Sequence, residues 1–320
     1  MGIAPFLKEI GRGKDGARSL TEEQAEDVFG RVLDRAVTDL EVGAFLMAMR
    51  IKGESDAELA GFLRAVHARS LLVPLPRPAV LLPSYNGARK LPNLTPLLAA
   101  LLAREGVPVL AHGQRQDPTR VTSAEVFDAL GWGLATGVPD VQAAWSSGRP
   151  AFLPLDVLCP ALSALLDIRW TIGLRGPGHT ICKLLQPTTG APALRVVSYT
   201  HPEYGRGHQA FLQQAGALAM LMRGTEGEPV ADPRRQPKAE VFIHGQPRPE
   251  LSLEREDGVL AEVPLLPEGY DAATTAGYIR DLLDGRVPVP APITQQVRAC
   301  VAALQAAQEA APEGPAAVPA

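Results

Sequence analysis

The stretch Pro83-Ser84-Tyr85-Asn86-Gly87-Ala88-Arg89-Lys90 decides the fold, because it is a turn between an apolar strand and a helical run. The helical run extends to Glu105, and a second strand then ends in His112-Gly113-Gln114-Arg115. This order is a βαβ unit, whose ligands gather at the carboxyl ends of the parallel strands. A turn that cradles a diphosphate is normally glycine-rich, so that bare N–H groups can approach the phosphates. Here a single glycine remains, and side chains and positive charge crowd the turn.

A helical region precedes this unit. N-cap candidates within 19–23, at Thr38 and at Ser55 each begin a run of apolar residues at helical spacing. After a proline-rich linker at 73–78, short apolar strands alternate with helices. The pattern predicts a small N-terminal helical domain, 1–72, and a larger α/β domain, 73–320, with a mainly parallel sheet. Residues near 150–185 are expected to contribute to the helical domain.

The remaining elements follow from apolar runs and their boundaries. We expect strand or loop elements at 80–82, 107–111, 152–155, 171–172, 194–199, 241–243 and 259–263. We expect helices at 94–104, 123–130, 209–222, 271–284 and 294–308, and a frayed end over 310–320.

Composition indicates an ordinary soluble protein, with 46% hydrophobic and 21% charged residues. No apolar run approaches the roughly 20 residues of a membrane span, and the first 13 residues contain no long apolar signal segment. The three cysteines are far apart in the sequence, which favours reduced thiols and a cytoplasmic location.

The net charge of −4 argues against a nucleic-acid partner, but residues 169–240 carry nine Lys and Arg against five Asp and Glu. Residues 241–320 carry five against eleven, so the chain has a basic middle and an acidic end.

The N-terminal segments Leu20–Glu26 and Gly43–Glu54 resemble the helical, dimer-forming domain of the anthranilate phosphoribosyltransferase family. That family shares its fold with the pyrimidine nucleoside phosphorylases. Phe45, Leu46, Met47 and Met49 exceed what three helices can bury, which also favours a two-fold contact between two copies.

The catalytic motifs of that family match only in part. Its first loop reads Gly-Thr-Gly-Gly-Asp where this chain has 84–88, and its Lys-His-Gly-Asn-Arg is similar to 111–115 without the lysine. Its Leu-Gly-x-Arg-Thr is similar to 172–176, which keeps Arg175. The family's magnesium-holding Asp-Glu pair is expected just after Tyr199, where this chain offers only Glu203. Magnesium needs oxygen ligands to bridge it to substrate phosphates, so these departures argue against phosphoribosyl transfer.

The same departures resemble the YbiB-type branch of this fold, on the segments 84–90, 198–204 and 223–229. That resemblance implies a homodimer that binds single-stranded DNA or RNA with little sequence specificity. We therefore predict no catalytic residue, no metal ligand and no cofactor. A remnant pocket is expected from Ser84, Tyr85, Asn86, Gly87, His112, Gly113 and Arg175. Nucleic-acid or phosphate contacts are expected from Arg89, Lys90, Arg115, Arg120, Arg206, Arg223, Arg234, Arg235 and Lys238.

Two alternatives stay open. One is a phosphoribosyltransferase or other glycosyltransferase with altered motifs, which would use magnesium, and the other is a sensor of a small phosphate ligand in the remnant pocket. Stacking of unpaired bases is a candidate role for Tyr85, Tyr199 and Tyr204 in the first interpretation. Packing with a bonded hydroxyl is the competing interpretation of these tyrosines, and we favour it for Tyr199.

Overall fold

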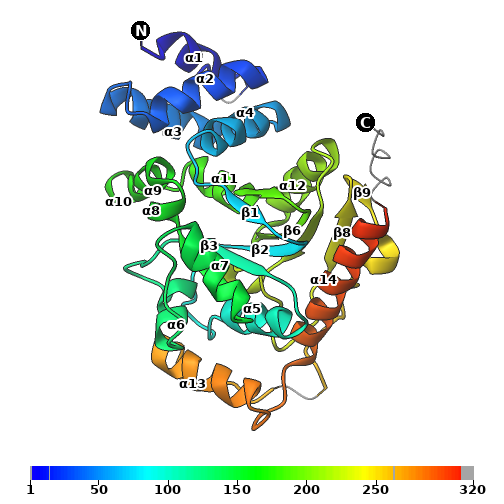
Figure 1. Ribbon diagram of the computed structural model, residues 1–320. Helices are drawn as coiled ribbons and strands as arrows, with labels where there is room; N and C mark the ends of the chain where they lie inside the picture. Colours follow the sequence, from blue (N-terminus) through cyan, green and yellow to red (C-terminus); the bar gives the residue numbers. More distant parts are fainter. Residues whose placement is uncertain (1, 14, 262–263, 311–320) are drawn as a thin grey trace, which may run out of the picture.

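Four helices form the N-terminal part of the computed structural model, which describes residues 2–13, 15–261 and 264–310 (Figure 1). They are α1 (Ala4–Ile10), α2 (Glu22–Leu33), α3 (Asp39–Lys52) and α4 (Asp56–His67). Thr21, Thr38 and Ser55 each close a capping box with the residue three positions later, Gln24, Glu41 and Glu58. The three expected helices of this region are thereby confirmed, whereas α1 was not foreseen.

A seven-stranded sheet forms the larger part of the molecule, in the order β4-β3-β2-β6-β7-β8-β9. The first five of these pair in parallel, and β8 and β9 are antiparallel. Their bounds are β2 (Ala79–Ser84), β3 (Val109–Gly113), β4 (Ala151–Pro154), β6 (Ala193–Tyr199), β7 (Ala219–Arg223), β8 (Ala239–Ile243) and β9 (Gln246–Pro247). The predicted fold class is therefore confirmed.

The two faces of the sheet bury alternate residues of each strand. Val80 and Leu82 of β2 pack in one apolar cluster with α5 (Thr95–Arg104), α6 (Ser123–Ala129), α13 (Ala272–Leu283) and α14 (Ala291–Glu309). Leu81, between them, belongs to the opposite cluster, together with α12 (Pro202–Gln214) and the N-terminal helices. This alternation explains why a strand buried on both faces reads as a continuous apolar run.

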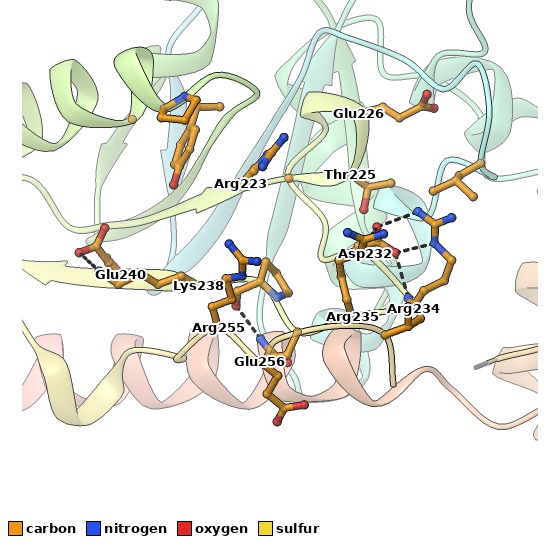
Figure 2. Close-up of a pocket in the computed structure, with 18 of the residues that line it drawn as sticks. Arg223, Thr225, Glu226, Asp232, Arg234, Arg235, Lys238, Glu240, Arg255 and Glu256 are labelled. Atoms are coloured by element: carbon orange, nitrogen blue, oxygen red, sulfur yellow. Dashed lines mark hydrogen bonds and ion pairs between the residues drawn. The ribbon is translucent and has the colours of Figure 1, made fainter. Parts of the chain in front are cut away.

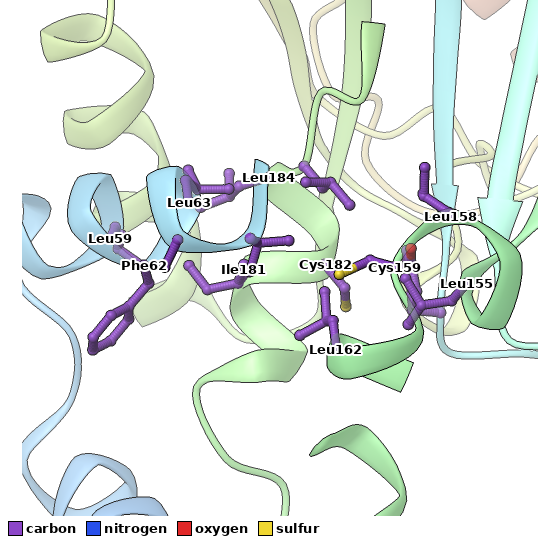
Figure 3. Close-up of a cluster of buried hydrophobic side chains, with 14 of the residues drawn as sticks. Leu59, Phe62, Leu63, Leu155, Leu158, Cys159, Leu162, Ile181, Cys182 and Leu184 are labelled. Carbon is purple, nitrogen blue, oxygen red and sulfur yellow. The ribbon is translucent and has the colours of Figure 1, made fainter. Parts of the chain in front are cut away.

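The segment after β4 returns to the N-terminal helices. It forms α8 (Leu155–Leu158), α9 (Pro160–Asp167), α10 (Arg169–Ile172) and α11 (Gly178–Leu184). Figure 3 shows Ile181 and Leu184 of α11 and Leu162 of α9 in one cluster with Leu59 and Phe62 of α4. The remaining elements are α7 (Val138–Ser146), β1 (Val73–Leu75), which pairs with β5 (Thr188–Gly190), and the short 3₁₀ turns η1 (Thr225–Gly227) and η2 (Pro249–Leu251).

Several expected boundaries are wrong. The apolar run 209–222 is not one helix, because α12 ends at Gln214, Gly216 turns the chain at φ 60°, and β7 begins at Ala219. Residues 171–172 lie in α10, and the proline-rich linker contains β1. Residues 259–261 are in no strand, while 262–263 and 311–320 lie outside the described residues. No helix of the described part is long and apolar enough to cross a membrane.

Candidate functional site

The first turn, residues 84–90, holds a buried carboxylate from its own chain. Glu228, only 1% exposed, accepts hydrogen bonds at Oε1 from the backbone N–H groups of Asn86 (2.7 Å) and Gly87 (2.8 Å). Its Oε2 accepts from the hydroxyls of Ser84, Thr95 (3.3 Å) and Ser123 (3.4 Å). Backbone N–H groups in such a turn are the usual receptors of a phosphate oxygen, and here a carboxylate occupies them.

A second carboxylate, that of Glu226, fills the rest of the turn. Its Oε2 accepts from the N–H groups of Arg89 (2.8 Å) and Lys90 (3.2 Å), and its own carbonyl accepts from Asn86 Nδ2 (2.9 Å). Gly227 between the two carboxylates has φ 89°, and a Cβ there would lie 1.8 Å from Asn86 Nδ2. The Glu-Gly-Glu segment after β7 thus packs closely against the turn after β2 and is hydrogen-bonded to it.

Neither glutamate was singled out from the sequence. Carboxylates were sought after β6, whereas those that reach the first turn follow β7. Glu203, the acid expected there, is exposed. The available signal was a Glu-Gly-Glu motif that begins three residues after a strand, at the edge of the sheet where ligands of parallel sheets gather.

The remnant pocket residues do come together, but mostly as internal contacts. Tyr85, 5% exposed, pairs through its hydroxyl with His112 Nδ1 at 2.8 Å, so the candidate stacking role of Tyr85 is wrong. Arg175 Nη1 donates to Asn86 Oδ1 at 3.0 Å, and Gly113 packs so closely that a Cβ would lie 1.9 Å from the Ser84 carbonyl oxygen. Burial, with Arg195 nearby, lowers the pKa of His112 to about 3, so this imidazole is neutral at pH 7.

A cleft of about 1040 Å³ opens beside the first turn (Figure 2), between α12, the end of β7 and the segment 232–240. It is lined by seven basic residues, of which only Arg255 was not predicted. Four acids also line it, Glu226, Asp232, Glu240 and Glu256, so positive charge is in excess by three. The basic residues are Lys90, Arg206, Arg223, Arg234, Arg235, Lys238 and Arg255.

The basic residues of the cleft are not equally available. Asp232 pairs with Arg234 (3.0 Å) and Arg235 (3.4 Å), and Glu240 pairs with Lys238 (2.8 Å). Arg206 and Arg223 are both exposed and have no ion pair among the described residues. Lys90 is likewise exposed and in no ion pair among the described residues, so these three side chains carry the least compensated positive charge of the cleft.

Three predicted basic residues lie outside the cleft. Arg115 is paired with Asp156 at 2.8 Å, and Arg120 donates to the carbonyl oxygen of Gly87 at 3.3 Å. Arg89 is exposed next to Lys90 but does not line the cleft. The structure therefore brings together six of the nine predicted basic residues.

An inner pocket of about 250 Å³ lies next to the cleft and shares Tyr199 with it. It is lined by Arg50, Arg175 and Lys183, with three histidines and no Asp or Glu. Lys183 Nζ donates to two carbonyl oxygens at 3.3 Å each, and burial lowers its pKa to about 8. The hydroxyl of Tyr204 accepts from Arg50 at 3.1 Å.

Magnesium and a diphosphate do not fit the residues present. The two carboxylates at the first turn already accept backbone and hydroxyl hydrogens, and they occupy the N–H groups that a diphosphate would need. Nowhere in the described residues do three or more His, Cys, Asp or Glu side chains form a group that could hold a metal ion.

Comparisons with known proteins agree with this fold. The helical bundle domain of a glycosyl transferase family matches residues 4–70. The YbiB protein of Escherichia coli K12, described as uncharacterised, is 40% identical over 306 residues, covering 95% of this chain and 94% of that protein. The anthranilate phosphoribosyltransferase of Beijerinckia indica is 26% identical, over 88% of this chain and 81% of the enzyme.

Solved structures show the same fold. The anthranilate phosphoribosyltransferase of Thermus thermophilus superposes with a TM-score of 0.69 and 23% identity, covering 95% of this chain and 89% of that one. The Saccharomyces cerevisiae enzyme in complex with PRPP and Mg gives 0.69 and 15%, with the same coverage. The bundle, the mainly parallel sheet and the similarity over nearly its whole length establish that this chain belongs with YbiB among the proteins of the anthranilate phosphoribosyltransferase-like fold.

Proposed function

We propose that this protein is a non-catalytic homodimer that binds single-stranded DNA or RNA in the cleft, with little dependence on sequence. The observation that carries the proposal is the gathering of seven Lys and Arg side chains, six of them predicted, around one open cleft. Phosphate contacts of this kind position a strand without reading its bases.

Arg206 and Arg223 provide the sharpest test, since no acid of the described residues neutralises them. The double variant R206E/R223E should weaken binding of every oligonucleotide alike. Loss of two phosphate contacts should also flatten the slope of log K against log salt by about 1.4, since each contact contributes about 0.7 for a single strand. R234E/R235E should act in the same direction but more weakly, because Asp232 already holds both arginines.

The matched control is R18E/R77E, which changes the net charge equally at two exposed positions outside the cleft. Fluorescence anisotropy over a salt series separates the two variants. The proposal fails if the wild-type protein leaves labelled oligonucleotides unbound at low salt, or if both double variants bind alike.

Dimerisation is proposed through α3, but through other residues of this helix than those expected from the sequence. Phe45, Leu46 and Met49 are buried within one protomer, so they are not an excess. The exposed side of α3 instead carries Leu40 (84% exposed) and Ile51 (68%). Ala44 and Met47 lie between them at helical spacing, which makes a continuous apolar stripe that a second copy would cover.

The first turn bears on the alternative of phosphoribosyl transfer, and the inner pocket bears on the alternative of a small phosphate ligand. Phosphoribosyl transfer is disfavoured because Glu226 and Glu228 occupy the phosphate-binding N–H groups. Magnesium-dependent transfer to anthranilate, abolished by a chelator, would overturn that reasoning. A small phosphate ligand is favoured only by the acid-free inner pocket, and calorimetry with inorganic phosphate tests it.

The cytoplasmic location is likewise proposed, on the three unpaired, buried cysteines.

A further inference from the structure

A third hollow extends the cleft and the inner pocket into one path. This outer hollow, of about 320 Å³, is lined by α10 and the residues 173–175 that follow it, and by Thr119 and Arg120 of the loop before α6. It shares Gly173, Leu174 and Arg175 with the inner pocket, which shares Tyr199 with the cleft. The cleft, the inner pocket and the outer hollow therefore lie next to one another in that order. Arg223 lines the cleft at one end of this path, and α10 lines the outer hollow at the other end.

Positive charge continues along this path. Arg120, Arg169 and Arg175 line the outer hollow, and neither it nor the inner pocket is lined by an Asp or Glu. Taken together, the three hollows are lined by twelve Lys and Arg and by four Asp and Glu, all four in the cleft. The excess of eight positive charges contrasts with the net charge of −4 for the whole chain. Such a charged path suits a polyanion longer than the cleft.

Trp170 is the exposed aromatic side chain at the far end. It is 48% exposed and lines the outer hollow. The guanidinium of Arg169 lies 4.0 Å from its ring centroid, and Arg169 is itself fixed by a buried pair with Asp117. The ring is thus held by a cation while half of its surface remains open. Leu174 beside it is 41% exposed.

The tyrosines that sequence analysis considered for stacking are less suitable. Tyr85 is buried, and the ring of Tyr199 packs on Gly205, where a Cβ would meet it at 3.0 Å. Tyr204 is half-buried and its hydroxyl is bonded to Arg50. Trp170 directly precedes 171–172, which were expected to be strand or loop, and no element or role was predicted for it.

We propose that a single strand bound in the cleft continues along this path and stacks an unpaired base on Trp170. The inference rests on the proposed function. It adds to the phosphate contacts of that site a contact between Trp170 and a base. A stacked base contributes affinity whatever its identity, since every base has a π-face, and Arg169 beneath the ring adds a cation–π partner.

The test compares W170A with W170F and with Y270A, using oligothymidylates and abasic strands of equal length. Tyr270 is the matched control, because it is 42% exposed and lines none of the three hollows. W170A should weaken oligothymidylate binding by about 5- to 150-fold, the range for loss of one stacked base. W170F should recover most of the loss, Y270A should bind as wild type, and abasic strands should not distinguish the variants.

Tryptophan fluorescence gives an independent readout. Trp145 is only 8% exposed and Trp132 is half-buried, so quenching by a bound base should come from Trp170. Wild-type emission should be quenched by oligothymidylate and not by abasic strands. The inference is overturned if W170A and Y270A bind alike while R206E/R223E still weakens binding, because the strand then uses the cleft alone. It is also overturned if W170A changes the sedimentation coefficient, since Trp170 would then lie between copies. Absence of any wild-type binding would instead overturn the proposed function.

Discussion

Replacing Glu228 by alanine should destabilise the protein and empty the first turn. The carboxylate is 1% exposed and is bound by two backbone N–H groups and three hydroxyls. The hydroxyls of Ser84 and Ser123 lie 2.6 Å apart, so one of them can donate to the other once the carboxylate is gone. The N–H groups of Asn86 and Gly87 have no such alternative and would lose their acceptor.

The expected cost follows from those two groups. A buried donor left without a partner costs about 1–3 kcal/mol, so E228A should lower the free energy of unfolding by about 2–6 kcal/mol. E228Q keeps an oxygen for the two N–H groups and presents its amide to hydroxyls that can rotate to accept. It loses only the charge-assisted part of the bonds and should cost roughly 1 kcal/mol.

Urea unfolding followed by circular dichroism measures both variants, with E203A as the control at an exposed glutamate outside the first turn. The E228A turn should also become a receptor for pyrophosphate, which would raise the free energy of unfolding by about 2.7 kcal/mol at 100 times its Kd. Wild type should not respond through this turn. A loss below about 1 kcal/mol in E228A, or equal losses in E228A and E228Q, would refute the reasoning from unsatisfied N–H groups.

Two further predictions concern acid stability and assembly. His112, His179 and His208 have pKa values lowered to about 3 by burial, so the unfolded chain takes up protons below pH 6.5 that the folded chain does not. The free energy of unfolding should therefore fall with decreasing pH, by up to about 1.4 kcal/mol per histidine per pH unit, and urea unfolding that is unchanged between pH 7 and about 5.5 would contradict this. L40K/I51K should convert a dimer into a monomer in sedimentation velocity, whereas L265K, at another exposed leucine, should not; a wild-type monomer at micromolar concentration would remove the basis for this prediction.

Local signals explain which parts of the fold could be predicted. The helices after Thr21, Thr38 and Ser55 have caps and apolar stripes within a few residues, and these suffice to place their starts. The prediction of one helix over 209–222 was wrong because the apolar residues continue through the turn at Gly216, from a helix into a strand. Glu228 could not be found this way, since it meets Gly87 across 141 positions of sequence. That contact exists only because β2 and β7 end at the same edge of the sheet, with β6 between them.

The chain has an acidic net charge and yet contains a basic path. The two are compatible because the positive charge lies along the path and the negative charge lies elsewhere in the chain. Since the path carries an excess of eight positive charges and the chain totals −4, the rest of the chain carries −12. If the protein binds a strand as proposed, a strand that left the path would meet repulsion, which would confine it more effectively than a uniformly basic surface. The internal carboxylates act in the same sense at short range. They exclude a small diphosphate from the N–H groups of the first turn but leave Arg206 and Arg223 without a partner among the described residues. A polymer gains affinity from many such exposed contacts, whereas a small ligand depends on the enclosed ones that are filled.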